Sequence, residues 1–205
     1  MIKLLNILQE ITVGPNSTYQ KILDYIQNGS QGALDLRKVD IKRLPKSLKV
    51  VGGDLDLHNT PIQSLPDGLE VGGYLDLRGT NIKELPNDLK VGSDLILSNT
   101  PIQSLPNSLE VGRNLYLNNS QIQSLPNGLK VGGILDLDNC KNLESLPNDL
   151  KVEYFLSLDN TPIQSLPDNL TVGDDLYLRN TPLSEKYTTE EIKAMVPGVK
   201  GKIYL

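Results

Sequence analysis

Nucleophilic chemistry would depend on two residues, because Cys140 is the only cysteine of the chain and His58 its only histidine. A cysteine nucleophile needs a base within hydrogen-bond reach, about 3 Å. The two residues lie four repeats apart in a chain with a period near 20 residues, which is about 19 Å at the spacing of parallel strands. One side chain is expected to face outward and the other inward. We therefore predict no Cys–His pair.

Acidic and basic residues also recur at the repeat spacing. Carboxylates on neighbouring parallel strands stack about 4.8 Å apart, which is unfavourable unless they are compensated, and such a ladder suits a cation or a basic partner. A second, cationic stripe two residues further along each strand can neutralise the first, so we expect self-compensation. The acidic stripe is Asp35, Asp56 and Asp76, and the cationic stripe is Arg37, His58 and Arg78.

No other arrangement of reactive side chains stands out in the sequence. It shows no Ser-His-Asp order, no cluster of metal ligands and no phosphate loop, and V-G-G-D-L-D lacks the G-G-x-G-x-D of calcium-binding nonapeptide repeats. We therefore expect no catalytic residue, no cofactor and no bound metal. An enzyme would need a deep pocket with converging polar groups, which a continuous sheet does not provide.

The elements that position these residues come from a 20-residue unit. The segment VGGDLDLHNTPIQSLPDGLE at 51–70 returns as VGGYLDLRGTNIKELPNDLK at 71–90, and the pattern continues with one-residue slips to about residue 183. A unit of this length cannot close a hydrophobic core alone and buries its leucines only by stacking on its neighbours. The sequence predicts one elongated solenoid with one broad surface.

The repeat resembles the leucine-rich repeat family. Leu55, Leu57, Ile62 and the Leu65-Pro66 step stand at that family's apolar positions, and the motif recurs seven or more times in register over residues 30–183. The resemblance implies an α/β repeat solenoid with a curved parallel β-sheet on its concave side. The family's asparagine position is held by hydroxyl residues, which we expect to bond the loop backbone: Thr60, Thr80, Thr100, Ser120, Thr161 and Thr181.

Cys140 takes the same position in a repeat that is one residue longer, between Leu137 and Leu143. The leucine-rich repeat family also shows this variant. The resemblance therefore implies a structural thiol, and we expect His58 to be a surface residue of the charge stripe.

Each repeat is expected to hold one strand and one extended return leg. Leu55 and Leu57 alternate with polar residues, the period-two pattern of a strand with inward leucines. A proline in each return leg denies a backbone donor and favours an extended or polyproline-like convex side. Glycine marks the turn into most strands, where we expect a positive φ or a close approach of the backbone. These glycines are Gly52, Gly72, Gly92, Gly112, Gly132 and Gly173. Glu153 stands at the equivalent position of one repeat and breaks the series.

We predict a single domain of three parts: an N-terminal helical cap at 1–29, the repeat array at 30–183 and a C-terminal cap at 184–205. Caps are needed because an open solenoid exposes its terminal leucines. Residues 199–205 match 172–178 in their apolar positions, which predicts a final parallel strand.

Helices are predicted in both caps from capping and breaking residues. The N-terminal cap should hold an apolar helix within 2–11 and a second helix that a capping box opens and an Asn-Gly pair ends. The C-terminal helix should open on a second capping box and end at a Pro-Gly pair. The signals are Ser17 with Gln20 and Asn28-Gly29 in the first cap, and Thr188 with Glu191 and Pro197-Gly198 in the second.

Outward positions of the strands form columns across the predicted sheet, with large apolar side chains among acids. The first column is Ala33, Asp54, Tyr74, Asp94, Asn114, Ile134, Phe155 and Asp175, and the second is Asp35, Asp56, Asp76, Ile96, Tyr116, Asp136, Ser157 and Tyr177. Exposed aromatic and branched residues on a concave sheet are typical of a binding patch. Alternatively, they only stabilise the sheet by cross-strand contacts of about 0.2–1 kcal/mol each.

The candidate partner-binding residues follow from these columns. They are Tyr74, Ile96, Tyr116, Ile134, Phe155 and Tyr177, together with Asp138, Asp159 and Arg179. Near the C-terminal end the acids have little cationic compensation apart from Arg179, so a basic patch on a partner would fit there. The Glu153-Tyr154-Phe155 segment is either a hot spot or a locally altered turn.

Composition restricts the class of partner. The net charge of −5 and a pI near 4.9 oppose a nucleic-acid or anionic-membrane surface, both of which call for clustered Lys and Arg. No stretch approaches the roughly 18 apolar residues of a transmembrane helix. The N-terminus does not resemble a signal peptide, and one cysteine argues against a disulfide framework, so we expect a cytoplasmic protein.

The sequence as a whole favours a non-catalytic scaffold that recognises a protein through its concave sheet. The thin repeat resembles small bacterial or bacteriophage leucine-rich repeat proteins, which implies a prokaryotic or phage origin. The alternative is a structural, self-assembling protein. In that case the outer edge of the C-terminal strand would pair with a second copy, although a monomer is the simpler expectation.

Overall fold

Parallel strands, one per repeat, form the body of the protein. The computed structural model describes residues 17–205, so the helix expected within 2–11 lies outside the described residues. A nine-stranded parallel sheet runs through them in chain order, which confirms the predicted repeat solenoid. Its strands are β1 (Leu34–Asp35), β3 (Leu55–Asp56), β5 (Leu75–Asp76), β7 (Leu95–Ile96), β9 (Leu115–Tyr116), β11 (Leu135–Asp136), β13 (Leu156–Ser157), β15 (Leu176–Tyr177) and β16 (Ile203–Tyr204).

A second set of short parallel strands lines the entry into each repeat, and the sequence did not indicate it. The strands β2 (Val50–Val51), β4 (Glu70–Val71), β6 (Lys90–Val91) and β8 (Glu110–Val111) form one sheet, and β10 (Lys130–Val131), β12 (Lys151–Val152) and β14 (Thr171–Val172) form another. We call these two sheets the second ladder. Neighbouring repeats are therefore hydrogen-bonded at two places around the turn.

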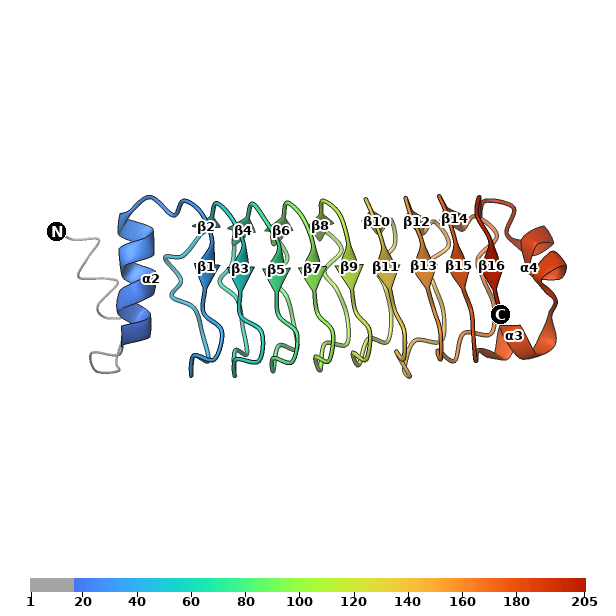
Figure 1. The fold of residues 1–205 in the computed structure, drawn as a ribbon, viewed down its shortest axis with the longest axis horizontal. Coiled ribbons are helices and arrows are strands. Elements are labelled where there is room, and N and C mark those ends of the chain that lie inside the picture. The colour runs from blue at the N-terminus through green and yellow to red at the C-terminus, as the bar shows by residue number, and fades with distance from the viewer. Residues whose placement is uncertain (1–16) are drawn as a thin grey trace.

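The repeats stack side by side in one row, with α2 at one end and α3 and α4 at the other (Figure 1). A helix about 10 Å across on the back of a repeat would wedge neighbours apart, whereas strands stack about 4.8 Å apart. Between β1 and β15 the described chain holds no helix, as expected, and the second ladder keeps the strand spacing. We call the solvent side of the nine-stranded sheet the sheet face.

One continuous apolar cluster fills the interior along the row. In a single repeat Leu55, Leu57, Ile62 and Leu69 are all fully buried, and the equivalent residues of the other repeats join the same cluster. Burial of a leucine side chain contributes about 1.5–3 kcal/mol. One repeat supplies a single layer of such side chains. These side chains are buried only because the neighbouring repeats cover both sides of the layer.

Hydroxyl groups close the loop after five of the strands, as the sequence predicted, whereas Ser120 Oγ accepts the N–H of Ile122 at 3.5 Å instead. Thr60 Oγ1 donates to the Leu57 carbonyl at 2.7 Å, and Thr80, Thr100, Thr161 and Thr181 make the equivalent bond within their own repeats. These threonines are only 1–2% exposed. The bond satisfies a buried carbonyl with a group from the same repeat.

Glycine and asparagine have different roles in the turns. The entry glycines allow close approach: a Cβ on Gly132 would lie only 2.6 Å from the carbonyl oxygen of Gly112 in the preceding repeat. Positive φ occurs instead two residues after the second leucine, for example at Asn59 (56°) and Asn119 (59°). Asparagine tolerates this left-handed region better than most residues. Of the two alternatives that the sequence left open for these glycines, close approach is confirmed and positive φ is not the reason.

The helix α2 (Ser17–Gln27) covers the first repeat. Ile22 is fully buried in the apolar cluster with the first leucines of the array, and Leu23 is also buried. Lys21 Nζ donates to the carbonyl of Asp35 in β1, so a side chain of the cap bonds the edge of the sheet.

The predicted end of this helix is confirmed, because α2 stops before Asn28 and Gly29 has a φ of 82°. The Ser17 side chain, half of the predicted capping box, lies outside the described residues. Gln20 Nε2 donates to Asp24 Oδ1 at 2.8 Å, one turn further along the helix.

Two helices and a strand form the C-terminal cap. The predicted capping box is confirmed at α4 (Thr189–Met195), where Thr188 and Glu191 bond each other's backbone N–H groups. The sequence missed α3 (Pro182–Lys186), whose N-cap is Thr181. That threonine also closes the last repeat, so its second role was hidden by the repeat pattern. The predicted final strand is confirmed, since β16 pairs with β15 in the register Leu176↔Ile203 and Tyr177↔Tyr204.

The hydroxyl closure can be tested at Thr100. The variant Thr100→Val keeps the shape of the side chain and removes its bond to the Leu97 carbonyl, so we expect the free energy of unfolding to fall by about 1–3 kcal/mol. Thr100→Ser keeps the hydroxyl and should lose less. Urea denaturation followed by circular dichroism measures both. Equal loss in the two variants would show that methyl packing, and not the hydroxyl, matters there.

Candidate functional site

The first column of the sheet face carries polar side chains that bond the next repeat. Asp54 Oδ1 accepts the Tyr74 N–H at 3.0 Å, and Asn114 Oδ1 accepts the Ile134 N–H at 2.8 Å. Asp94 does the same for the next repeat at 3.2 Å. These oxygens accept the backbone N–H groups that lie just before each two-residue strand. The polar residues of this column are therefore part of the scaffold.

Carboxylates of the second column bond the backbone within their own repeat. Asp76 Oδ1 accepts the Arg78 N–H at 3.1 Å, and Asp136 Oδ1 accepts the Asp138 N–H at 3.0 Å. Two residues after Asp136, Asp138 Oδ1 accepts the N–H of Asp159 in the next repeat at 3.0 Å. Sequence reasoning placed these acids in surface charge stripes and did not predict their bonds to the backbone. The missed signal was their fixed distance of one residue from the inward leucines.

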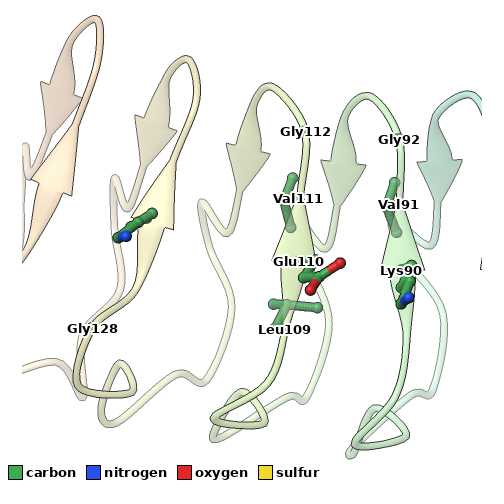
Figure 2. Close-up of a pocket in the computed structure, with 9 residues that line it drawn as sticks. Lys90, Val91, Gly92, Leu109, Glu110, Val111, Gly112 and Gly128 are labelled. Atoms are coloured by element: carbon green, nitrogen blue, oxygen red, sulfur yellow. The ribbon is translucent and has the colours of Figure 1, made fainter.

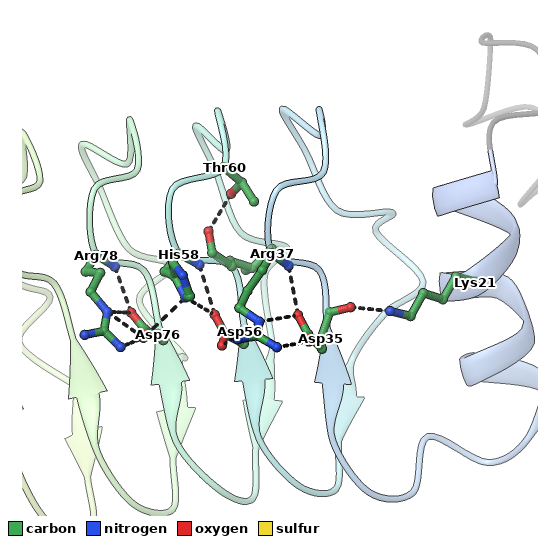
Figure 3. A network of polar contacts seen from close by, with 9 residues as sticks. Lys21, Asp35, Arg37, Asp56, His58, Thr60, Asp76 and Arg78 are labelled. Atoms are coloured by element: carbon green, nitrogen blue, oxygen red, sulfur yellow. Dashed lines mark hydrogen bonds and ion pairs between the residues drawn. The ribbon is translucent and has the colours of Figure 1, made fainter.

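The N-terminal part of the sheet face is a network of alternating acids and bases (Figure 3). Arg37 reaches Asp35 at 2.6 Å and Asp56 at 3.5 Å, so it links two neighbouring strands. Hydrogen bonds from Arg37 lower the pKa of Asp35 to about 2. The first carboxylate of the acidic stripe is thus compensated, as the sequence predicted.

The same network continues toward the middle of the sheet. His58 Nδ1 lies 2.8 Å from Asp56 Oδ1 and 3.9 Å from Asp76 Oδ2. Arg78 Nε lies 2.8 Å from Asp76 Oδ2, and the Asp76 side chain is only 1% exposed. The bond to Asp76 raises the pKa of Arg78. Self-compensation of the two stripes is therefore confirmed, with a buried carboxylate that the sequence did not anticipate.

Three potential metal ligands meet in this network. Ligand atoms of Asp56, His58 and Asp76 lie within 4.8 Å of one another, an arrangement that the sequence did not reveal. Arg37 and Arg78 already contact the two carboxylates, so a cation would have to displace a guanidinium group. The geometry therefore supports an internal ion network more than a metal site.

Acids without such close compensation lie toward the C-terminal half of the face. Burial is the main cause that raises the pKa of Asp136 and of Asp138 above the ordinary range. Ser157 Oγ donates to Asp138 Oδ1 at 2.5 Å. Asp159 forms an ion pair with Arg179 at 3.3 Å. Two half-buried carboxylates with no ion pair within residues 17–205 therefore lie beside one paired acid.

The predicted apolar residues of the face divide into separate groups, and each of them is half-buried. Ile96 and Tyr116 are direct cross-strand neighbours on β7 and β9. Tyr74 and Ile134 belong to the first column, three repeats apart. The structure thus brings only some of the predicted residues together.

Aromatic rings concentrate at the C-terminal end of the face. The rings of Phe155 and Tyr177 meet edge to face with centroids 5.8 Å apart, and those of Tyr177 and Tyr204 stack at 4.7 Å and 8°. The guanidinium of Arg179 lies 5.2 Å from the centre of the Tyr177 ring and 5.3 Å from that of Tyr204. We call these four residues the aromatic cluster. Tyr204 was missed as a site residue because the final strand is recognised by its apolar spacing alone.

The Glu153-Tyr154-Phe155 segment differs from the usual entry into a repeat. Tyr154 is 60% exposed, whereas Phe155 is half-buried in the aromatic cluster. Backbone bonds from Glu153 to the Val131 carbonyl and from Tyr154 to the Gly133 carbonyl keep the normal stacking, each at 3.1 Å. The turn therefore accepts side chains without losing its register.

Cys140 is fully buried, as the sequence predicted. Its Sγ donates to the Leu117 carbonyl at 3.2 Å and lies 3.7 Å from Ser120 Oγ. Burial raises the pKa of this thiol to about 11, so it stays protonated at neutral pH. The thiol takes the place of a loop hydroxyl and reaches back to the preceding repeat.

A cavity of about 550 Å³ opens where the second ladder is interrupted between β8 and β10 (Figure 2). Its charged lining residues are Lys90, Glu110 and Lys130. Val91, Val111 and Leu109 supply apolar walls. This lining lacks a nucleophile with an adjacent base, so the cavity offers no recognisable catalytic arrangement.

Comparisons with known proteins add little. The sequence matches no family model and no curated protein. One similar solved structure is that of a leucine-rich repeat protein from Leptospira interrogans. It is 19% identical, with a TM-score of 0.37, over 82% of this chain and 59% of that protein. This chain therefore spans about three fifths of its length. The fold assignment depends on the strands and register described above.

No helix in residues 17–205 has the length and apolar character that crossing a bilayer requires.

The buried carboxylate of Asp76 makes the ion network testable. Arg78→Gln removes its guanidinium partner, and we expect a loss of about 1–3 kcal/mol in the free energy of unfolding, because the carboxylate is buried although the Arg78 side chain is half exposed. Arg37→Gln is the matched control, because Arg37 and Asp35 are about half exposed, and it should cost less than about 1 kcal/mol. Denaturant titration distinguishes the two. Similar small losses would mean that water reaches Asp76.

The raised pKa of Asp136 predicts a pH effect. Its pKa is higher in the folded than in the unfolded chain, so its contribution favours folding at low pH and is lost as pH rises through the folded value. Asp136→Asn keeps an oxygen acceptor for Asp138 N–H. We expect it to stabilise the protein at pH 7 by less than about 1 kcal/mol and to lose this advantage near pH 3.

Thermal unfolding at several pH values measures the difference. Asp174→Asn, at an exposed position, serves as the control and should show no comparable gain. An Asp136→Asn variant less stable than wild type at pH 7 would contradict the assignment.

Proposed function

We propose that the protein is a non-catalytic scaffold that recognises another protein through its sheet face. The observation that carries this proposal is the aromatic cluster of Phe155, Tyr177, Tyr204 and Arg179. These residues are partly exposed and form one contiguous patch on neighbouring strands. Aromatic and arginine side chains in fixed positions are typical anchors of protein interfaces.

The rigidity of the cluster supports this role. Tyr177 and Tyr204 project from paired strands, and Arg179 lies against both rings. Little side-chain entropy remains to be lost when a partner covers them. Ile96 and Tyr116 extend the apolar surface toward the middle of the row. Cross-strand stabilisation alone would explain stacked rings, but it does not require that their outer faces stay in contact with solvent.

The acidic residues of the sheet face indicate which class of partner it would bind. The half-buried carboxylates of Asp136 and Asp138 have pKa values raised by burial, so a positive group placed beside them would relieve an unfavourable ionisation. Asp159 and Arg179 lie next to them as an ion pair that can rearrange at the surface. We propose a protein partner with a basic patch flanked by apolar residues. An acidic chain with a net charge of −5 is a poor candidate for nucleic-acid binding.

The proposal can be tested by affinity capture from a prokaryotic lysate with mass spectrometry. The test variant carries Tyr116→Asp, Phe155→Asp and Tyr177→Asp on the sheet face. The matched control carries Gln63→Asp, Gln103→Asp and Gln123→Asp at exposed positions of the return legs. We expect a partner retained by wild type and by the control, and reduced at least about tenfold by the test variant.

Circular dichroism must first show that both variants fold. A basic partner should also bind more weakly as pH falls toward 4, because protonation of Asp136 and Asp138 removes their charge. Proteins retained equally by both variants would contradict recognition through the sheet face. Loss in the return-leg variant alone would move the site to the opposite side of the row.

A further inference from the structure

β1 and β16 are the two edge strands of the nine-stranded sheet. The outer edge of β16 is the one that the cap does not cover along its whole length. In the inner strands, the N–H of the first leucine donates to the following repeat, as Leu156 does to Asp175 at 3.1 Å and Leu176 does to Lys202 at 2.9 Å. β16 is the last strand of the sheet in the described chain. The same geometry therefore directs the N–H groups of Ile203 and Leu205 away from β15.

The other end of the sheet and part of this end are closed. Lys21 of α2 bonds the carbonyl of Asp35 in β1. At the C-terminal end, Lys193 Nζ of α4 donates to the carbonyls of Val199 and Gly201, the latter at 3.2 Å. A further repeat would donate backbone N–H groups to these carbonyls, as Gly201 itself does to Asp174 at 2.9 Å. Lys193 thus takes the place of the next repeat at the carbonyls that precede β16. Only the outer edge of β16 itself keeps backbone groups without a partner strand.

A groove lies beside this open strand. Its volume is about 460 Å³. One wall is α4, through Thr189, Glu190 and Lys193, and the other is the segment from Gly201 to Tyr204. The groove therefore runs along the row of backbone groups that lacks a strand partner.

We propose that this groove binds a short extended peptide as a tenth parallel strand, with the pattern acidic, aliphatic, aromatic. In a parallel sheet a strand meets equivalent side chains on both of its edges. The residues of the neighbouring strand that already pairs with β16 therefore indicate which residues would suit its open edge. That neighbour is β15, where Asp175, Leu176 and Tyr177 lie beside Lys202, Ile203 and Tyr204. The Tyr177 ring stacks on the Tyr204 ring at 4.7 Å.

Charge favours the same peptide. Lys200 and Lys202 are exposed at this edge, and neither forms an ion pair within residues 17–205. An acidic residue in the first column of an added strand would lie next to Lys202. An apolar residue would follow beside Ile203, and an aromatic residue would stack on the free side of Tyr204. The main-chain bonds supply affinity, and the alternate side chains supply specificity.

A second copy of this chain fits less well. The β1 edge of a second copy is covered by α2, so copies cannot join head to tail through their sheets. Two β16 edges related by a two-fold axis would pair antiparallel. That pairing does not reproduce the neighbours of Lys202 and Tyr204 seen in β15. The groove shares Tyr204 with the aromatic cluster, but the backbone edge that it offers belongs to β16 alone.

The test uses a fluorescein-labelled peptide, Gly-Asp-Asp-Leu-Tyr-Leu-Arg-Asn, which copies residues 173–180, and fluorescence anisotropy with the 205-residue chain. In the proposed register the peptide tyrosine N–H donates to the Ile203 carbonyl, whereas the N–H of the preceding leucine points away. N-methylation of the tyrosine should weaken binding at least about tenfold, and N-methylation of that leucine less than about twofold.

Protein variants give the matched readout. Leu205→Pro removes the outward N–H at the end of the strand and should weaken peptide binding at least about tenfold, whereas Leu205→Ala keeps it and should not. Lys202→Glu should also weaken binding. Tyr116→Asp, which alters the sheet face, should leave binding of this peptide unchanged.

Several results would overturn the proposal. One is the absence of saturable binding up to about 1 mM peptide. Equal effects of the two N-methylated peptides, or equal affinity of the Leu205→Pro and Leu205→Ala variants, would place the peptide elsewhere. A dimer that light scattering detects in wild type and not in Leu205→Pro would assign the edge to a second copy. Failure of the capture experiment on the sheet face would not affect any of these readouts.

Discussion

The spacing between neighbouring repeats is the constraint on which the rest of the structure depends. Backbone bonds fix it at two places in each turn, for example Leu55 N–H to the Tyr74 carbonyl and Gly72 N–H to the Val51 carbonyl, both at 2.8 Å. At this spacing a side chain at most entry positions would collide with the preceding carbonyl, so glycine occupies them. The same spacing brings identical residues of successive repeats next to each other, which makes leucine a good interior choice and carboxylate a costly exterior one.

The repulsion between the acids of the sheet face is offset by the hydrogen bonds that they accept from the backbone. Two-residue strands leave N–H groups on both sides of each strand, and oxygens of Asp54, Asp76 and Asp138 accept several of them. A carboxylate that receives such bonds is held in place and partly desolvated. The chemical variety of the face is therefore carried by a subset of positions, among them Ile96, Phe155 and Tyr177. These positions supply no bond to the backbone, and they are the ones available for contact with another molecule.

The sequence predicted the architecture well because its signals are periodic and local. Leucine spacing gave the main strands, the match of 199–205 to 172–178 gave β16, and the Thr188–Glu191 pair gave α4. The second ladder was not predictable, because its strands mix one exposed and one buried residue over only two positions. The burial of Asp76 and the meeting of Tyr204 with Arg179 were missed for another reason. They depend on side chains from different repeats crossing the face, which alternation along one strand does not reveal.

The interruption of the second ladder between β8 and β10 has a consequence for cooperativity. Every other pair of consecutive second-ladder strands from β2 to β14 is hydrogen-bonded, whereas this junction lacks those backbone bonds and has a cavity beside it. In a one-dimensional array the coupling between adjacent repeats decides how far unfolding spreads. We therefore expect weaker coupling across this junction than across those that have both sets of backbone bonds. We expect local opening of the array to begin at this boundary, near Leu109 and Lys130.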